Sequence, residues 1–193
     1  AFLSHIPGMR LYAPATLGSL RAVLRDSLTA EGPLTIRYEN RADDPAIVSA
    51  FYPDGDFSSY GVRPDFASPL AARDGIILTY GAVAAEALRA KAMLAEEGLS
   101  VGVILLECLK PYGELAERLL PYVAGAPRLL FLEEGIRDGG AGMLLLDRLR
   151  AKGLSAAARI LAIDDHFADP DSPVTLREHC HISADDVAEF FRS

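Results

Sequence analysis

A run of glycines and acidic residues at positions 133–142 is the most distinctive local feature of the sequence. It follows an apolar stretch and leads into a helical pattern, and the free backbone amides of such a turn can bind an anion. The spacing matches neither a dinucleotide fingerprint nor a phosphate loop, and Glu133, Glu134 and Asp138 would repel a phosphate. We therefore favour a tight turn that lets a helix pack closely on a sheet over phosphate binding.

Two other clusters contain groups that bind metals elsewhere. Residues 164–171 are rich in carboxylates but lack the glycine turn and the distal glutamate of an EF-hand, so we interpret them as a solvated loop after a strand. The run from His179 to His181 offers three ligands, but adjacent side chains diverge and no second cluster accompanies them. No nucleophile motif is present either. The sequence therefore predicts no metal site and no catalytic residue.

Two arginines, Arg37 and Arg41, flank Tyr38 at the end of a predicted strand. Two guanidinium groups at a strand end can hold a phosphate through bidentate hydrogen bonds. The alternative is a pair of surface arginines that Glu39 and nearby aspartates neutralise. Spacing alone favours this alternative.

The bulk composition excludes several classes of function. The chain has 193 residues, half of them hydrophobic, and a net charge of −8. An acidic chain repels phosphates, so we expect no nucleic-acid and no membrane partner. No apolar run approaches the roughly 20 residues that span a bilayer. Its two cysteines, Cys108 and Cys180, lie far apart, which indicates no disulfide framework and predicts a cytoplasmic location.

Beyond Arg73, continuous apolar strands alternate with amphipathic helices. We predict strands at 76–80, 101–106, 129–132 and 159–163, and helices at 82–97, 113–122, 140–152, 174–179 and 184–191. Strands that are apolar throughout are typical of a parallel sheet whose two faces are both covered by helices. The predicted fold class is therefore α/β, with a mainly parallel sheet and helices on both faces, preceded by a partial α/β segment.

That partial segment occupies residues 1–40. A strand at 11–13, a helix capped by Thr16 and a strand at 34–38 are expected there. The leucines of the helix recur on one face, at Leu17, Leu20, Leu24 and Leu28. A strand–helix–strand unit cannot close a core, so it must pack against something else. Residues 41–73 are rich in turn formers and are predicted to be a linker, followed by a second domain at 74–193.

Several short motifs follow one another along almost the whole chain. They are residues 1–14, Gly32-Pro33 with 36–38, residues 74–81, Glu86-Ala87-Leu88, Lys110-Pro111, Glu133-Glu134-Gly135 with Gly139-Gly140-Ala141-Gly142, and Asp165-His166-Phe167. In this order they resemble the C-terminal portion of 1-deoxy-D-xylulose-5-phosphate synthases, which are transketolase-type enzymes. The resemblance implies that 1–40 ends a pyrimidine-binding domain and that 74–193 is a transketolase C-terminal domain. It implies a structural role for the motif residues Glu134, Gly139, Gly140, Gly142, Asp165 and Phe167.

The resemblance also implies a parent reaction. These enzymes use thiamine diphosphate, held by Mg²⁺, to condense pyruvate with glyceraldehyde 3-phosphate, and the cofactor carries the difficult chemistry. In the family, the cofactor sites precede the portion that this chain resembles. We therefore expect no bound cofactor and no activity without the missing N-terminal domains or a partner chain. The family's packing implies a homodimer.

One motif bears on the substrate. The family's Arg-Tyr-Pro-Arg places its second arginine on the substrate phosphate, whereas the matching residues here are Arg37-Tyr38-Glu39-Asn40, and Arg41 falls one residue late. A bulge would let Arg41 reach a phosphate, which Glu39 would oppose. The residues after Lys110-Pro111 and after Asp165-His166-Phe167 also differ from those usual in the family. These differences are compatible with an acceptor substrate other than glyceraldehyde 3-phosphate. Two alternatives stay open: a small subunit of a split transketolase-like enzyme, and an α/β ligand-binding module.

Overall fold

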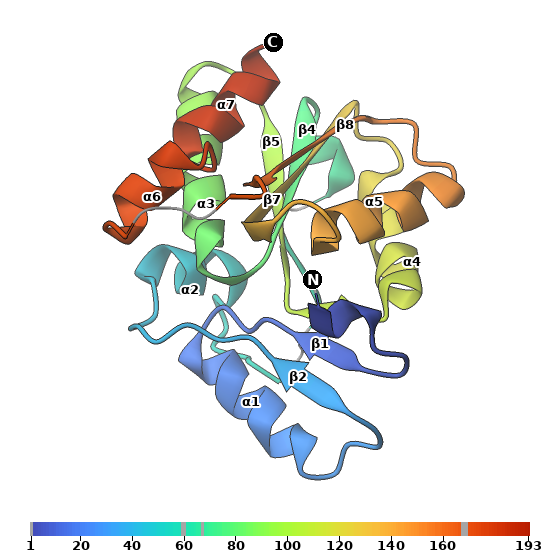
Figure 1. Ribbon diagram of the computed structural model, residues 1–193. Coiled ribbons are helices and arrows are strands. Elements are labelled where there is room, and N and C mark those ends of the chain that lie inside the picture. Colours follow the sequence, from blue (N-terminus) through green and yellow to red (C-terminus); the bar gives the residue numbers. More distant parts are fainter. Residues whose placement is uncertain (1, 59–60, 67, 167–169) are drawn as a thin grey trace.

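A five-stranded sheet organises most of the chain (Figure 1). In spatial order it contains β3 (Val62–Asp65), β5 (Val101–Leu106), β4 (Gly75–Thr79), β7 (Arg128–Ile136) and β8 (Ala157–Ile163). The last four strands run parallel, and β3 pairs antiparallel with β5 at one edge. These coordinates are a computed structural model, which describes residues 2–58, 61–66, 68–166 and 170–193.

Helices cover both faces of this sheet (Figure 1). One face packs against α2 (Pro45–Phe51), α3 (Ala84–Glu96) and α7 (Ala184–Arg192), and the other against α4 (Tyr112–Val123) and α5 (Ala141–Ala151). Alternate residues of β4 enter the two cores, Ile77 on the first side and Ile76 and Leu78 on the second. All three are fully buried, as the uniformly apolar strand pattern predicted. The α/β fold class is confirmed.

The sequence pattern of α3 shows why these helices form where they do. Val83, Ala87, Ala90 and Leu94 recur at helical spacing, and all four are buried against the sheet. The helix stops at Gly98, whose φ of 82° lies in the left-handed region that a glycine adopts without strain. The expected helix over residues 82–97 is thus confirmed, with the short 3₁₀ turn η3 (Gly81–Val83) at its start.

A small sheet lies below the large one in Figure 1. It contains β2 (Leu34–Ile36), β1 (Arg10–Tyr12) and β6 (Cys108–Lys110), in that order. β1 and β2 are parallel and α1 (Leu17–Ser27) connects them, as expected, whereas β6 is antiparallel to β1. Because β6 directly follows β5 of the large sheet, the C-terminal part of the chain adds a strand to the N-terminal segment. The sequence analysis did not foresee this pairing.

The helix α1 begins as predicted but buries an unexpected face. The side chain of Thr16 accepts a hydrogen bond from the amide of Ser19, which completes a capping box. The residues that α1 buries are Ser19, Ala22 and Val23, while Leu17, Leu24 and Leu28 are exposed. Three of the four leucines that recur on one face of this helix are therefore exposed, and Leu20 is partly buried.

Residues 41–73 contain more regular structure than the expected linker. The carboxylate of Asp44 caps α2 by accepting from the amide of Ala46, and Pro45 occupies the first turn. Strand β3 joins the large sheet, and a 3₁₀ turn, η2 (Pro69–Ala71), precedes β4. The expectation of continuous loop was wrong because three short elements are surrounded by turn-forming residues. The division into domains at positions 40 and 74 stays a prediction.

Candidate functional site

A cleft of about 520 Å³ lies between the two sheets, where β4 and β7 end. Its walls include Leu11, Arg37, Tyr80, Tyr112, Glu133 and Glu134. In the large sheet, β4 has β5 on one side and β7 on the other, so the order of strands reverses at β4. The carboxyl ends of strands at such a switch point are where open α/β sheets bind ligands. The cleft is therefore our candidate functional site.

Glu133 is the buried carboxyl group of this cleft, with 1% of its surface exposed. Its Oε2 accepts hydrogen bonds from the Tyr80 hydroxyl at 3.0 Å and from the Ala141 amide at 3.1 Å, and its Oε1 accepts from the Gly142 amide at 3.1 Å. The free amides at the start of α5 thus already have a carboxylate partner from the same chain. This arrangement supports the tight-turn interpretation of the glycine cluster over phosphate binding.

The motif glycines lie where backbone geometry demands them. A Cβ atom at Gly142 would approach the Phe131 ring to 2.6 Å, and one at Gly140 would approach the Ile136 carbonyl oxygen to 2.6 Å. Gly139 has a φ of 68°, in the left-handed region. The turn and the close contact of α5 with β7 therefore exclude larger side chains, which supports the structural role predicted for these glycines.

The pH dependence of stability should report on Glu133. Burial raises the pKa of this carboxyl, and the bonds from Tyr80 and the α5 amides only partly oppose the rise. The native chain therefore keeps the proton at pH values where the unfolded chain, with an ordinary glutamate pKa of about 4.3, has lost it. The free energy of unfolding should thus fall as pH rises from about 4.3 through the native pKa. We expect Glu133→Gln, which cannot titrate, to gain stability relative to wild type over this range. Urea unfolding at stepped pH measures the difference, and a constant difference would contradict the expectation.

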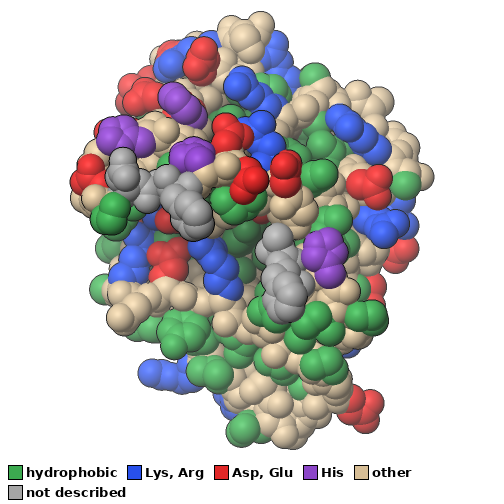
Figure 2. Space-filling view, in the orientation of Figure 1, with side chains coloured by type: hydrophobic (Ala, Val, Ile, Leu, Met, Phe, Trp, Pro, Cys, Tyr) green, Lys and Arg blue, Asp and Glu red, His purple; other side chains and the backbone are tan. Residues whose placement is uncertain are grey.

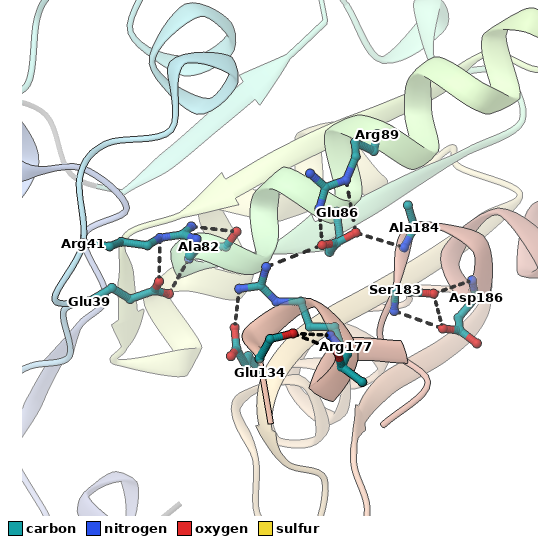
Figure 3. A network of polar contacts seen from close by, with 12 residues as sticks. Glu39, Arg41, Ala82, Glu86, Arg89, Glu134, Arg177, Ser183, Ala184 and Asp186 are labelled. Atoms are coloured by element: carbon teal, nitrogen blue, oxygen red, sulfur yellow. Dashed lines mark hydrogen bonds and ion pairs between the residues drawn. The ribbon is translucent and has the colours of Figure 1, made fainter. Parts of the chain in front are cut away.

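Glu134 takes part in a network of charged groups beside the cleft (Figure 3). Its carboxylate lies 3.1 Å from Nη2 of Arg177, which projects from α6 (Pro173–His179), and Nη1 of Arg177 lies 3.5 Å from Glu86 on α3. Glu86 also bonds Arg89 and accepts from the Ala184 amide at 3.2 Å. The network ties the end of β7 to the C-terminal helices. No sequence pattern marked Arg177, because a single arginine in a short helix has no distinguishing spacing.

The two candidate phosphate ligands lie on either side of the turn that follows β4. Nη2 of Arg37 donates to the Glu134 carbonyl oxygen at 3.1 Å, and its guanidinium lies over the Tyr80 ring, within the cleft wall. Arg41 instead pairs with Glu39 at 2.9 Å and lines a different hollow (Figure 3). Glu39 in turn accepts from the Ala82 amide at 2.8 Å. Glu39 thus neutralises Arg41, as the alternative interpretation of the arginines anticipated.

The predicted motif residue Asp165 does not line the cleft. Asp165 is exposed on the bend after β8, where its neighbour Asp164 pairs with Arg137 at 3.1 Å. Phe167 lies outside the described residues. Within the described ranges, no three histidine, cysteine or carboxylate side chains gather as a metal site. No described helix has both the length and the apolarity needed to cross a bilayer.

Comparison with known proteins identifies this architecture. A family model described as "Transketolase, C-terminal domain" matches residues 70–187. The chain is similar to 1-deoxy-D-xylulose-5-phosphate synthases from Heliobacterium modesticaldum (27% identity, 100% of this chain and 28% of the relative) and Anaeromyxobacter sp. (30% identity, 100% and 30%). A solved structure titled "Split gene transketolase, inactive beta4 tetramer" matches with a TM-score of 0.81 and 25% identity, over 98% of this chain and 59% of that one. The chain spans less than a third of the length of these curated relatives.

Proposed function

The chain belongs to the transketolase family through its C-terminal domain, and we propose on that basis that it is one part of a thiamine-diphosphate-dependent transferase. The observation that carries the proposal is the match to 1-deoxy-D-xylulose-5-phosphate synthases along the entire chain. We propose the same condensation, of pyruvate with glyceraldehyde 3-phosphate, for the complete enzyme. Its free cysteines, Cys108 and Cys180, are in keeping with a cytoplasmic enzyme.

The described residues do not fit the cofactor that this reaction needs. Thiamine diphosphate is held through a divalent cation, and hard cations require a group of oxygen ligands that the described residues do not supply. The one glycine-rich helix start among them has its amides bonded to Glu133. We therefore assign cofactor and Mg²⁺ to another part of the enzyme or to a partner chain, and assign this chain a supporting role.

The complete enzyme provides the test of the proposed reaction. Incubation with pyruvate, glyceraldehyde 3-phosphate, thiamine diphosphate and Mg²⁺ should yield 1-deoxy-D-xylulose 5-phosphate, detected by mass spectrometry. A product formed only with another acceptor aldehyde would retain the transketolase assignment and overturn the proposed substrate.

Arg41 is the residue of this chain that we propose for the phosphate of the acceptor. It is partly exposed and already positioned by Glu39, so a phosphate could compete for its remaining donors. We expect Arg41→Ala in the complete enzyme to raise KM for a phosphorylated acceptor by about 10- to 100-fold, the value of a charge-assisted hydrogen bond. Arg150→Ala, on the exposed side of α5, is the matched control. An unchanged KM would remove Arg41 from the site.

The split-gene structure supports a second candidate organisation. That protein is described as an inactive β4 tetramer, so a chain of this architecture assembles with itself without catalysis. We propose that the present chain also self-associates and becomes active only with a companion polypeptide that supplies the cofactor sites. The curated relatives, of which this chain spans less than a third, favour a single longer chain instead.

A further inference from the structure

A second hollow, of about 200 Å³, lies on the opposite face of the small sheet from the cleft. Successive side chains of a strand point to opposite faces of its sheet, and β1 and β6 follow this rule. Leu11 and Leu109 line the cleft. Arg10, Tyr12 and Cys108 point the other way and line the second hollow, whose other wall is the start of α4. We call this hollow the arginine pocket.

Helical spacing brings one face of α4 to the arginine pocket. The residues of this face follow one another at intervals of three and four positions: Pro111, Glu114, Leu115 and Arg118. The pocket therefore receives one guanidinium group from each of its two walls, Arg118 from α4 and Arg10 from β1. Glu114 adds one carboxylate to the same lining.

Both guanidinium groups of the pocket keep hydrogen-bond donors available. Neither forms an ion pair with a carboxylate of the described residues, although Glu114 lies near enough to attract Arg10. The Tyr12 hydroxyl lies beside Arg10, and Arg118 packs against Gly61, where a Cβ atom would lie 3.5 Å from Nη1 of Arg118. A guanidinium carries five donors in a rigid fork that matches the oxygens of a phosphate. Two such groups held by their neighbours can therefore bind a phosphate through paired hydrogen bonds.

The local charge of the pocket is opposite in sign to that of the chain. The chain carries a net charge of −8, and Figure 2 shows basic side chains scattered among acidic ones on the face in view. The pocket lining has two guanidinium groups and one carboxylate, a net charge of +1. Two further carboxylates, Asp26 and Glu31, line the adjoining hollow beyond Arg10, and Asp26 lies 3.6 Å from Nε of Arg25. An anion is therefore attracted to the arginine pocket itself.

The size and polarity of the pocket limit the class of ligand. A volume of about 200 Å³ exceeds the roughly 30 Å³ of one water but falls below the roughly 300–1,000 Å³ of sites for drug-sized ligands. A phosphate group with a short carbon chain suits this space. Glu114 repels a bare phosphate but can accept a hydrogen bond from a ligand hydroxyl. We propose that the arginine pocket binds a small phosphomonoester that carries a hydroxyl group, with its phosphate on Arg10 and Arg118 and its hydroxyl on Glu114.

Cys108 provides a reporter of occupancy. Its thiol is free and partly buried. Burial raises the pKa of this thiol, and the positive charges of Arg118 and Arg10 oppose the rise, so both guanidinium groups lie near the sulfur atom. A ligand held by these groups should shield the thiol from reagents in solution. The second cysteine of the chain, Cys180, is buried away from the pocket lining and serves as an internal reference.

Isothermal titration calorimetry of the 193-residue chain with glycerol 3-phosphate, at constant ionic strength, tests the proposal. We expect saturable binding that weakens at least about tenfold in Arg10→Gln and in Arg118→Gln, the value of one charge-assisted hydrogen bond. Arg150→Gln, on the exposed side of α5, is the matched control and should bind as wild type does. Glycerol 3-phosphate should also slow the alkylation of Cys108 by iodoacetamide, read by peptide mass spectrometry. At the same ligand concentration, neither pocket variant should show this protection.

Glu114→Ala tests the hydroxyl contact separately from the phosphate contact. In wild type, glycerol 3-phosphate should bind more tightly than inorganic phosphate, because only the former offers hydroxyl groups to Glu114. Without the carboxylate, inorganic phosphate should bind more tightly than it does to wild type, since a like charge is gone. The advantage of glycerol 3-phosphate over inorganic phosphate should shrink in the same variant.

Three outcomes would overturn the inference. Absence of saturable binding at millimolar glycerol 3-phosphate would mean that the two arginines are only solvated surface groups. Undiminished binding in both Arg10→Gln and Arg118→Gln would place the phosphate elsewhere on the chain. Equal affinity of wild type for glycerol 3-phosphate and inorganic phosphate would remove the hydroxyl contact. Circular dichroism melts check that each variant folds, and should one arginine variant fail to fold, the other decides. The inference does not depend on the proposed reaction, which none of these measurements involves.

Discussion

Replacing Glu86 with alanine should lower the free energy of unfolding by about 3–5 kcal/mol, the cost of leaving a buried charge without its partner. Arg177 is 6% exposed, and its Nε already lacks a hydrogen-bond partner among the described atoms. Without Glu86, its guanidinium keeps only Glu134, and the Ala184 amide at the start of α7 loses its acceptor. Urea denaturation followed by far-UV circular dichroism measures the change.

A second glutamate–arginine pair offers the matched control. Glu97 pairs with Arg192 of α7, but both side chains are about two-fifths exposed, and exposed pairs contribute little to stability. We expect Glu97→Ala to change stability only slightly. Combining Glu86→Leu with Arg177→Met should recover much of the loss, because neither charge is then buried alone. Equal losses for Glu86→Ala and Glu97→Ala would show that the network is not a buried one.

We expect Glu107→Ala to lower the free energy of unfolding by a similar amount, with the structural effect confined to another region of the chain. Glu107 is fully buried, accepts from the Tyr52 hydroxyl and lies 2.9 Å from Nε of Arg63. The guanidinium of Arg63 in turn lies 4.2 Å from the centre of the Tyr52 ring. These three residues join α2 and β3 to the end of β5. Removing the carboxylate takes an ion-pair partner from the largely buried Arg63 and an acceptor from the Tyr52 hydroxyl, at a cost of about 3–5 kcal/mol.

Hydrogen exchange locates this second effect. Amides of residues 45–52 and 61–65 should exchange faster in Glu107→Ala. Amides of β4 and β7 should still exchange only through global unfolding, as in wild type. Tyr52→Phe, which removes one hydrogen bond and no charge, should cost about 1–3 kcal/mol. Unchanged exchange in α2 and β3 would mean that backbone pairing alone holds them.

The elements beyond residue 73 could be predicted because each carries its own local signal. β4 and β5 are apolar runs with both faces buried, and α3 ends at a glycine. β3 and β6 could not be predicted, since strands of four and three residues are defined by their partners rather than by periodicity. For α1 the helix was evident, but periodicity gives no reason to prefer Ala22 and Val23 over the leucines as the packing face.

The candidate site was less predictable than the fold. The glycine turn was recognised as a tight packing turn, yet Glu133 was weighed only as a charge opposing phosphate, although it caps α5. Tyr80 lies in the motif of residues 74–81 but was not weighed as a site residue, and Arg177, which lies beside the cleft, has no motif of its own. The pairing of Arg41 with Glu39 was one of two open interpretations, and the contact is present at 2.9 Å. Whether Arg41 also binds a substrate phosphate stays a prediction.

Release of labelled carbon dioxide from carboxyl-labelled pyruvate tests most directly whether this chain is a supporting part of a thiamine-diphosphate enzyme. We expect the purified chain, supplied with thiamine diphosphate, Mg²⁺ and an acceptor aldehyde, to release none. Release should begin once the polypeptide that carries the cofactor sites is joined to the chain or added to it. Turnover by these 193 residues alone would contradict the assignment of the cofactor sites to another polypeptide segment.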